Sequence, residues 1–168
     1  MKQWIRRYLA NRVARTVSGY LEREGLGELI ERAEQKLRTT GADRSDYALL
    51  HSYIRKYKPQ YVLELGSGIT TWVMADALRR NAQETKSQPC IVSMEESLKW
   101  HQHVCDEFPE ELSDYVRHVV SPAQPYRYTF VAGICYESIP DMSYDLVWVD
   151  GPAARMDAAD PNSQHSSC

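Results

Sequence analysis

The sequence predicts an α/β fold in which a doubly wound, mostly parallel sheet follows a set of N-terminal helices. Three observations support this prediction. Short apolar runs of strand length recur along the chain, stretches of helical periodicity separate them, and glycine, proline or polar breaks mark the boundaries. Strands that alternate with helices in this way are typical of a parallel sheet joined by right-handed crossovers.

Residues 1–44 are predicted to form a helical segment. The first twenty residues carry five basic and no acidic side chains, and apolar residues recur among them at helical spacing. We interpret this stretch as a helix that packs on the domain or on a partner chain. A helix on a membrane surface and an organelle transit peptide are alternatives that we favour less.

The clearest predicted helix comes just before the first strand. Apolar and aromatic residues from Leu49 to Tyr57 follow the i, i+3, i+4 rule. Asp43 or Ser45 can cap its N-terminus. Pro59 ends it, because proline has no N–H group to continue the helical hydrogen bonds.

Four predicted strands and two further helices follow. The strands are YVLEL (61–65), CIVSM (90–94), VRHVV (116–120) and DLVWV (145–149). The helices span residues 69–80 and 97–108, and a further short strand is predicted near FVAGICY (130–136). Apolar runs such as the first are typical of strands buried on both faces of a parallel sheet. Residues 156–168 show no strand signal and are predicted to be a disordered tail.

Composition narrows the classes of protein. With 168 residues, 43% of them hydrophobic, the chain is long enough for one globular domain with a real core. Its net charge of −3 argues against a general nucleic-acid binder. The four cysteines are far apart, which disfavours a disulfide framework or zinc site and predicts a cytoplasmic location. No apolar run is long enough to span a bilayer.

A glycine loop, Gly66-Ser67-Gly68, follows the first strand and opens the next helix. Ligands of open α/β sheets bind at the carboxyl ends of the strands. Glycine lets the backbone approach a ligand, and the helix N-terminus favours an anionic group. The loop therefore predicts a ligand site, although two glycines could also make only a tight turn.

Two acidic residues indicate which ligand. Glu95 ends the second strand, where a carboxylate can accept hydrogen bonds from both hydroxyls of a ribose. Glu64 precedes the loop, where it would repel the pyrophosphate of NAD by about 1–4 kcal/mol at 4 Å. Thr71 also stands where a dinucleotide motif has its third glycine. S-adenosylmethionine fits better, because it has a ribose, a carboxylate and cationic groups but no phosphate.

The motifs LELGSG, VSMEESLKW and YDLVWVDGP, in this order, resemble the class I S-adenosylmethionine-dependent methyltransferases, and most closely their small O-methyltransferase-like branch. The resemblance implies a partial Rossmann-like cofactor-binding domain over residues 45–155. It places Glu64, Gly66, Ser67 and Gly68 around the methionine portion and Glu95 at the ribose. It further places Ser121 and Pro122 near the adenine and Asp150 beside the methyl acceptor.

The chain departs from this family's pattern after the fourth strand. Members continue with a helix, a fifth strand and usually an antiparallel pair, whereas this sequence ends eighteen residues after Asp150 (168 − 150). We therefore expect a truncated form or a fragment, whose uncovered sheet edge could pair with a second copy.

Methyl transfer to a small-molecule or sugar-like hydroxyl, or to an amine, is the favoured function. Asp150 is the candidate catalytic residue, as a base or metal ligand, although Asp150-Gly151-Pro152 could also be only a turn. No bound metal is expected, because the further ligands of metal-dependent relatives come from beyond the fourth strand. A non-catalytic remnant that binds the cofactor or a partner is the alternative, and an NAD(P)-dependent oxidoreductase is disfavoured.

Overall fold

The computed structural model describes residues 2–39 and 42–152, so the predicted tail lies outside the described residues. The helices are α1 (Lys2–Arg23), α2 (Leu26–Leu37), α3 (Arg44–Tyr57), α4 (Ile69–Thr85), α5 (Leu98–Glu107) and the 3-10 helix η1 (Glu110–Tyr115). The strands are β1 (Tyr61–Leu65), β2 (Cys90–Glu95), β3 (Val116–Val120), β4 (Ala123–Tyr128), β5 (Val131–Tyr136) and β6 (Leu146–Val149).

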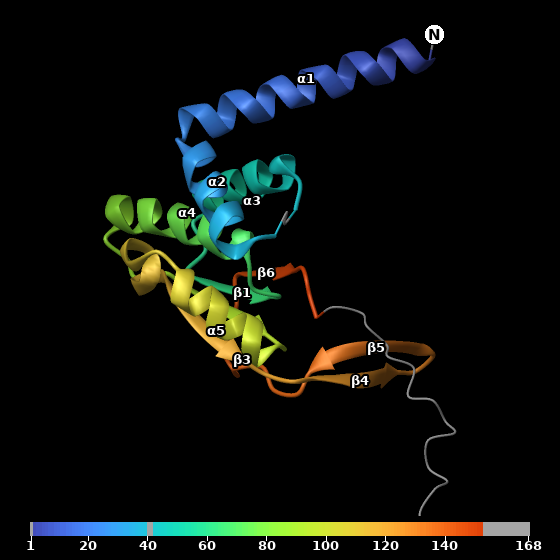
Figure 1. Ribbon diagram of the computed structural model, residues 1–168, viewed down its shortest axis with the longest axis vertical. Coiled ribbons are helices and arrows are strands. Elements are labelled where there is room, and N and C mark those ends of the chain that lie inside the picture. The colour runs from blue at the N-terminus through green and yellow to red at the C-terminus, as the bar shows by residue number, and fades with distance from the viewer. Residues whose placement is uncertain (1, 40–41, 153–168) are drawn as a thin grey trace, which may run out of the picture.

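Four strands form one parallel sheet in the order β3-β2-β1-β6. The first strand, β1, lies inside this sheet. Strands β2 and β3 follow on one side of it, and β6 pairs with its other side (Figure 1). The predicted α/β class, with a parallel sheet after N-terminal helices, is confirmed. Because β1 is central, the loop that follows it lies between the ends of two neighbouring strands.

Helices cover one face of this sheet. Val62 of β1 and Ile91 of β2 point toward α3 and α4, where they join Ile54, Met74 and Leu78 in one buried cluster. A second cluster joins α1, α2, α4 and α5 around the fully buried Trp72. The main core therefore lies between the sheet and a single helical layer.

The opposite face is covered differently. Leu63, Val92 and Met94 are buried there by Tyr136 and by the loop before β6. Within the described ranges, none of the residues in this cluster comes from a helix. A doubly wound sheet carries helices on both faces, whereas helices cover only one face of the described sheet.

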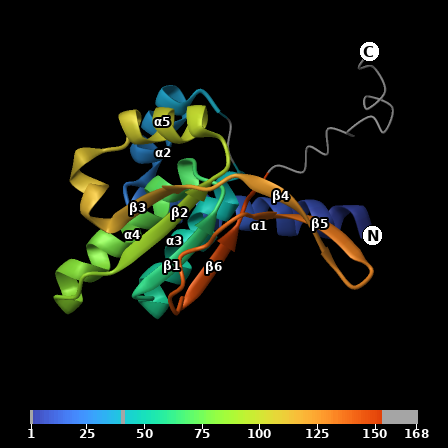
Figure 2. The same cartoon turned by 90° about the horizontal axis from the view of Figure 1, so that it is seen from below.

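The reason lies in the connection between β3 and β6, which is an antiparallel hairpin rather than a helix. The hairpin β4–β5 projects away from the sheet (Figure 2), and Phe130 at its turn is 98% exposed. The predicted strand near residues 130–136 is confirmed, whereas β4 was not foreseen. Pro125 concealed it, because proline is rare inside a sheet, but a hairpin of two edge strands tolerates it.

The helix before β1 is confirmed with its predicted boundaries. Asp43 caps it by accepting a hydrogen bond from the Ser45 backbone nitrogen at 2.8 Å. Lys58 adopts a left-handed conformation immediately before Pro59 and ends the helix.

Helix α4 continues to Thr85 and not only to residue 80 as predicted. The polar run after Arg80 resembles a loop, but the Asn81 side chain donates to the Ile54 carbonyl at 2.8 Å and holds this turn against α3. This contact joins residues far apart in sequence, so the local pattern did not reveal it.

Helix α1 extends beyond the rest of the domain (Figure 1). Its C-terminal end packs on the core through Val17, Tyr20 and Leu21, and the Tyr20 hydroxyl lies 2.7 Å from His51 Nδ1. This agrees with a helix packed on the domain. In the part of the chain that the structure describes, no helix is long and apolar enough to cross a membrane.

Candidate functional site

The glycine loop lies at the carboxyl edge of the sheet, between β2 and β6. The Gly66 nitrogen donates to the Met94 carbonyl at 2.9 Å, and the Asp150 nitrogen donates to the Leu65 carbonyl at 2.8 Å. Parallel pairing of β1 with both neighbours therefore brings Glu95 and Asp150 to the two sides of this loop.

Gly66 is required by the backbone around it. Its φ of 97° lies in the left-handed region that favours glycine. A Cβ atom at this position would lie 2.8 Å from the Gly151 nitrogen and 3.0 Å from the Asp150 carbonyl carbon. Gly66 thus permits a close approach between two segments of the chain, which is a structural role.

Gly68 differs from Gly66 in both respects. Its φ of 176° is extended backbone that any residue adopts, and a Cβ atom there would meet nothing within 4 Å. It stands at the N-cap of α4, so the open space beside it adjoins the positive end of a 17-residue helix. The fold leaves this space free, and it suits the anionic part of a ligand.

Glu64 is fully buried beneath the loop. Its Oε1 accepts from the Thr70 hydroxyl at 2.5 Å, and its Oε2 accepts from the hydroxyls of Thr71 and Ser93, both at 2.6 Å. Burial raises the pKa of Glu64 to about 7, despite these hydrogen bonds. The side chain braces β1, β2 and α4 against one another, and its predicted contact with a ligand stays a prediction.

Glu95 lies beside the loop rather than beneath it. Its Oε2 is 3.1 Å from the Ser67 hydroxyl and 3.3 Å from the Ser67 nitrogen, and its Oε1 accepts from the Ser97 nitrogen at 3.0 Å. Burial raises the pKa of Glu95. The carboxylate therefore joins the glycine loop to the first turn of α5.

Trp100 completes this corner and was missed by sequence reasoning. Its indole Nε1 donates to the Ser67 carbonyl at 2.9 Å and holds the loop from the side of α5. The motif VSMEESLKW contains Trp100, and its place five positions after Glu95 puts it in the first turns of the next helix. Its partner, 33 residues away, could not be read from the sequence.

Ser121 and Pro122 follow β3 at the same edge. The Ser121 nitrogen donates to the Glu95 carbonyl at 2.9 Å, which places Ser121 next to the end of β2. Its hydroxyl accepts from the Ser138 nitrogen at 3.0 Å, and the Pro122 carbonyl accepts from the Glu137 nitrogen. Both residues thus hold the return of the hairpin, and their predicted place near an adenine is untested.

Asp150 directly follows β6 and is largely exposed. Partial burial and the negative charge of Asp46 on α3 raise the pKa of Asp150, and the charge of Asp150 contributes in turn to the raised pKa of Glu64. Three carboxyl groups therefore interact electrostatically at this side of the loop. Such a place favours a cationic group and disfavours a phosphate.

A groove of about 660 Å³ opens between α2 and α5, within the size range of small-molecule sites, but its lining includes neither Glu95, the glycine loop nor Asp150. Ser97, Lys99 and Trp100 line it from the start of α5, and Lys36 and Arg38 bring positive charge from the end of α2.

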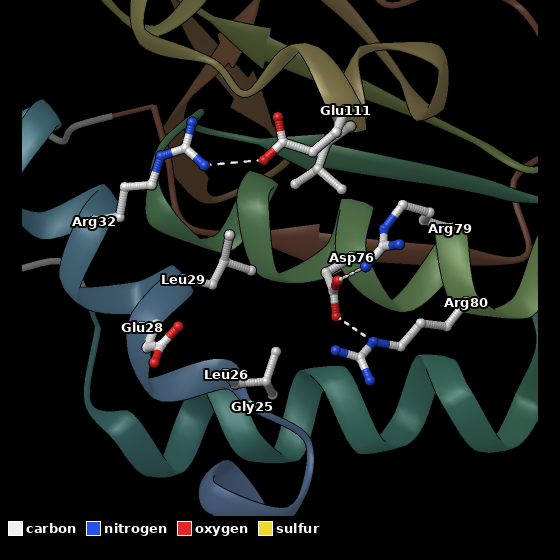
Figure 3. A pocket seen from close by; sticks show the side chains of 10 residues that line it. Gly25, Leu26, Glu28, Leu29, Arg32, Asp76, Arg79, Arg80 and Glu111 are labelled. Carbon is white, nitrogen blue, oxygen red and sulfur yellow. Dashed lines mark hydrogen bonds and ion pairs between the residues drawn. The ribbon is translucent and has the colours of Figure 1, made fainter.

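A second hollow, of about 270 Å³, lies between α2, α4 and η1 (Figure 3). Five of its charged side chains pair with one another: Arg32 with Glu111 at 2.9 Å, and Asp76 with Arg79 at 2.7 Å and with Arg80 at 2.6 Å. Asp76, the lining residue of α4 nearest the loop, is eight residues after Gly68 (76 − 68), or about 12 Å at the helical rise. This hollow is therefore separate from the candidate site.

Metal ligands do not gather in the described ranges 2–39 and 42–152, where no group of three or more His, Cys, Asp or Glu side chains could hold an ion. The expectation that the chain binds no metal stays a prediction.

Comparisons with known proteins give a likeness of fold only. No protein-family model and no curated protein matches the chain. Among solved structures, the SAH-bound methyltransferase PaMTH1 of Podospora anserina is 21% identical over 57% of this chain and 42% of its own, with a TM-score of 0.47. A methyltransferase from Geobacter sulfurreducens is 21% identical over 55% of this chain and 47% of its own, with a TM-score of 0.43.

At these TM-scores neither likeness carries an argument about family or activity. The chain spans less than half the length of either structure.

Proposed function

We propose that the carboxyl edge of this sheet binds S-adenosylmethionine and that the chain belongs to a methyltransferase. The observation that supports this most is the juxtaposition of three features: the Glu95 carboxylate, the open space at Gly68, and the acidic group around Asp150. Each feature matches a different part of one ligand.

The match is chemical. A carboxylate at the end of β2 can accept hydrogen bonds from ribose hydroxyls. The N-terminus of α4 at Gly68 favours the carboxylate of the methionine portion. The negative charges of Asp150 and Asp46, with a partial charge on Glu64, favour its ammonium and sulfonium groups. A dinucleotide would bring a pyrophosphate to this field, at a cost of about 1–4 kcal/mol for each pair of charges 4 Å apart.

When bound, the cofactor supplies an electrophilic methyl group for in-line displacement. The residues of this chain would hold it by its ribose and carboxylate and so set the direction of attack, which must bring the reacting atoms to about 3–3.5 Å. Asp150, exposed at the end of β6, is the candidate base for a proton from a hydroxyl or amine acceptor. We propose a small-molecule or sugar-like acceptor beside Asp150.

The second candidate is a cofactor-binding or interaction protein without turnover. Val147 and Val149 on the open face of β6 are 50% and 66% exposed, which favours association through this part of the sheet. We propose a second copy of the chain as the partner, no nucleic acid, and a cytoplasmic location in keeping with the unpaired Cys90, Cys105 and Cys135.

Calorimetric titration with S-adenosylhomocysteine, compared with NADH, tests the proposal. We expect binding of the first and none of the second. Gly68→Ala weakens the binding of S-adenosylhomocysteine by at least about tenfold, equivalent to about 1.4 kcal/mol. It lowers the thermal midpoint only slightly, through the poorer N-cap, because the added Cβ enters only the open space.

Gly66→Ala is the matched control and lowers the thermal midpoint, since its Cβ meets the backbone of Gly151. Binding of NADH instead, or a Gly68→Ala variant with undiminished affinity, contradicts the proposal. Turnover assays with hydroxyl and amine acceptors then separate the enzyme from the non-catalytic candidate.

A further inference from the structure

The Glu95 carboxylate already has several donors within its own chain. Two are backbone N–H groups, from Ser67 and Ser97, at 3.3 and 3.0 Å. The third is the Ser67 hydroxyl at 3.1 Å, which shares Oε2 with the Ser67 nitrogen. Glu95 and Ser67 are both buried, so this arrangement is largely shielded from solvent.

The number of free acceptor positions on Glu95 limits how many ribose hydroxyls it can bind. A carboxylate offers about four lone-pair positions. Three protein donors leave about one, whereas the two hydroxyls of a ribose need two. One protein donor must therefore give way before Glu95 can accept both.

Only one of these donors can leave without moving the backbone. The Ser67 nitrogen is held because Trp100 Nε1 binds the carbonyl of the same residue at 2.9 Å. The Ser97 nitrogen is held at the N-cap of α5, where the Ser97 hydroxyl accepts from the Trp100 nitrogen. The Ser67 hydroxyl, in contrast, can turn away by rotation about a single bond.

We propose that the Ser67 hydroxyl holds the place of a ligand hydroxyl on Glu95 and is displaced when a ribose-bearing ligand binds. Ser67 is thus a residue that sets affinity and specificity through competition, in addition to its place in the loop. This inference rests on the proposed function only in that the ligand carries a ribose.

A substitution of Ser67 should therefore change the affinity only for ligands that carry ribose hydroxyls. Removal of the competing hydroxyl in Ser67→Ala leaves Glu95 short of a donor in the free protein, so ligand hydroxyls bind more tightly. We expect adenosine and S-adenosylhomocysteine to gain about fivefold in affinity, the equivalent of one ordinary hydrogen bond. 2′,3′-Dideoxyadenosine, which lacks both hydroxyls, should gain nothing.

Calorimetric titration of these three ligands into the wild-type chain, Ser67→Ala and Ser113→Ala supplies the test. Ser113→Ala is the control, because it removes a serine hydroxyl that donates to the Glu110 carbonyl on η1 and has no contact with Glu95 or the glycine loop. It should not change the ratio of adenosine to dideoxyadenosine affinity. Ser67→Cys, a weaker donor, should give a gain between wild type and alanine and serves if the alanine variant does not fold.

The inference is overturned if Ser67→Ala binds adenosine no more tightly than wild type, or if adenosine and dideoxyadenosine gain equally. Failure of the proposed function looks different, because then the wild-type chain binds NADH in place of S-adenosylhomocysteine, or binds neither of them.

Discussion

The two faces of the parallel sheet differ in what they bury. On the helical side, Glu64 and Ser93 are fully buried although they are polar. On the other side, Val147 and Val149 are 50% and 66% exposed although they are apolar. This reverses the usual relation of polarity and burial.

The difference has a physical cause on each face. The polar side chains are satisfied, because Glu64 accepts hydrogen bonds from Ser93 and from two threonines of α4 at the functional edge. The two valines lie on β6, beyond the reach of the loop that covers Leu63 and Met94. Burial in this sheet is therefore decided by the layer above a residue and not by the residue type.

The largest expected effect compares truncations on the two faces. Ile91→Ala, on the helical face, should lower the free energy of unfolding by about 4 kcal/mol, because it leaves a cavity among closely packed helices. Val147→Ala should change it by less than about 0.5 kcal/mol. Urea unfolding followed by circular dichroism measures both. Equal losses would show that β6 is also packed on the second face.

The next effect concerns the buried acid on the helical face. The pKa of Glu64 rises from its ordinary 4.5 to about 7, so the folded chain binds this proton more tightly than the unfolded chain. The stability that it contributes is complete below pH 4.5 and is lost as the pH rises toward 7, by about 3 kcal/mol. Glu64→Gln should remove this loss in unfolding curves recorded from pH 4 to 8. A variant with the wild-type pH slope would contradict the assignment.

His118, on β3, should give a slope of the opposite sign. Burial, and the neighbouring His101 to a lesser degree, lower the pKa of His118 from 6.5 to about 4. The stability linked to its neutral form is complete above pH 6.5 and is lost as the pH falls toward 4. We expect about 2 kcal/mol, because the ring is only partly enclosed.

The His118 contribution should appear most clearly in the Glu64→Gln background, where the opposing slope is absent. His118→Phe in that background should then flatten the curve. A slope that persists would assign it to another group.

The smallest expected effect on stability is at the open face. Val149→Lys should change the free energy of unfolding by less than about 0.5 kcal/mol, because the side chain remains in solvent. It should abolish self-association of the wild-type chain in analytical ultracentrifugation if copies pair through this face. Unchanged association would show that copies pair through another surface. Phe130→Ser at the hairpin turn tests whether that surface is the hairpin.

The sequence alone predicted those strands and site residues whose positions depend on local pattern. The strands β1, β2, β3 and β6 were predicted because each is a short apolar run between turn residues. The position of Glu95 beside the glycine loop also followed, because parallel strands bring their carboxyl ends to one edge.

Strand β4 and the end of α4 could not be predicted in this way. Pro125 and the polar residues after Arg80 contradict the local preferences of the structures that contain them. Contacts from distant residues stabilise both segments, through the pairing with β5 and the hydrogen bond of Asn81 to Ile54.

The amino-acid order by itself determined the class of fold, the succession of the central strands and the edge at which polar residues collect, because these follow from periodicity and chain direction. Tertiary structure alone decided that Glu64 braces the loop, that Trp100 and Ser67 meet, and that helices pack on only one face of the described sheet. Those outcomes depend on distances between residues that are remote along the chain, and such distances are set only when the elements pack together.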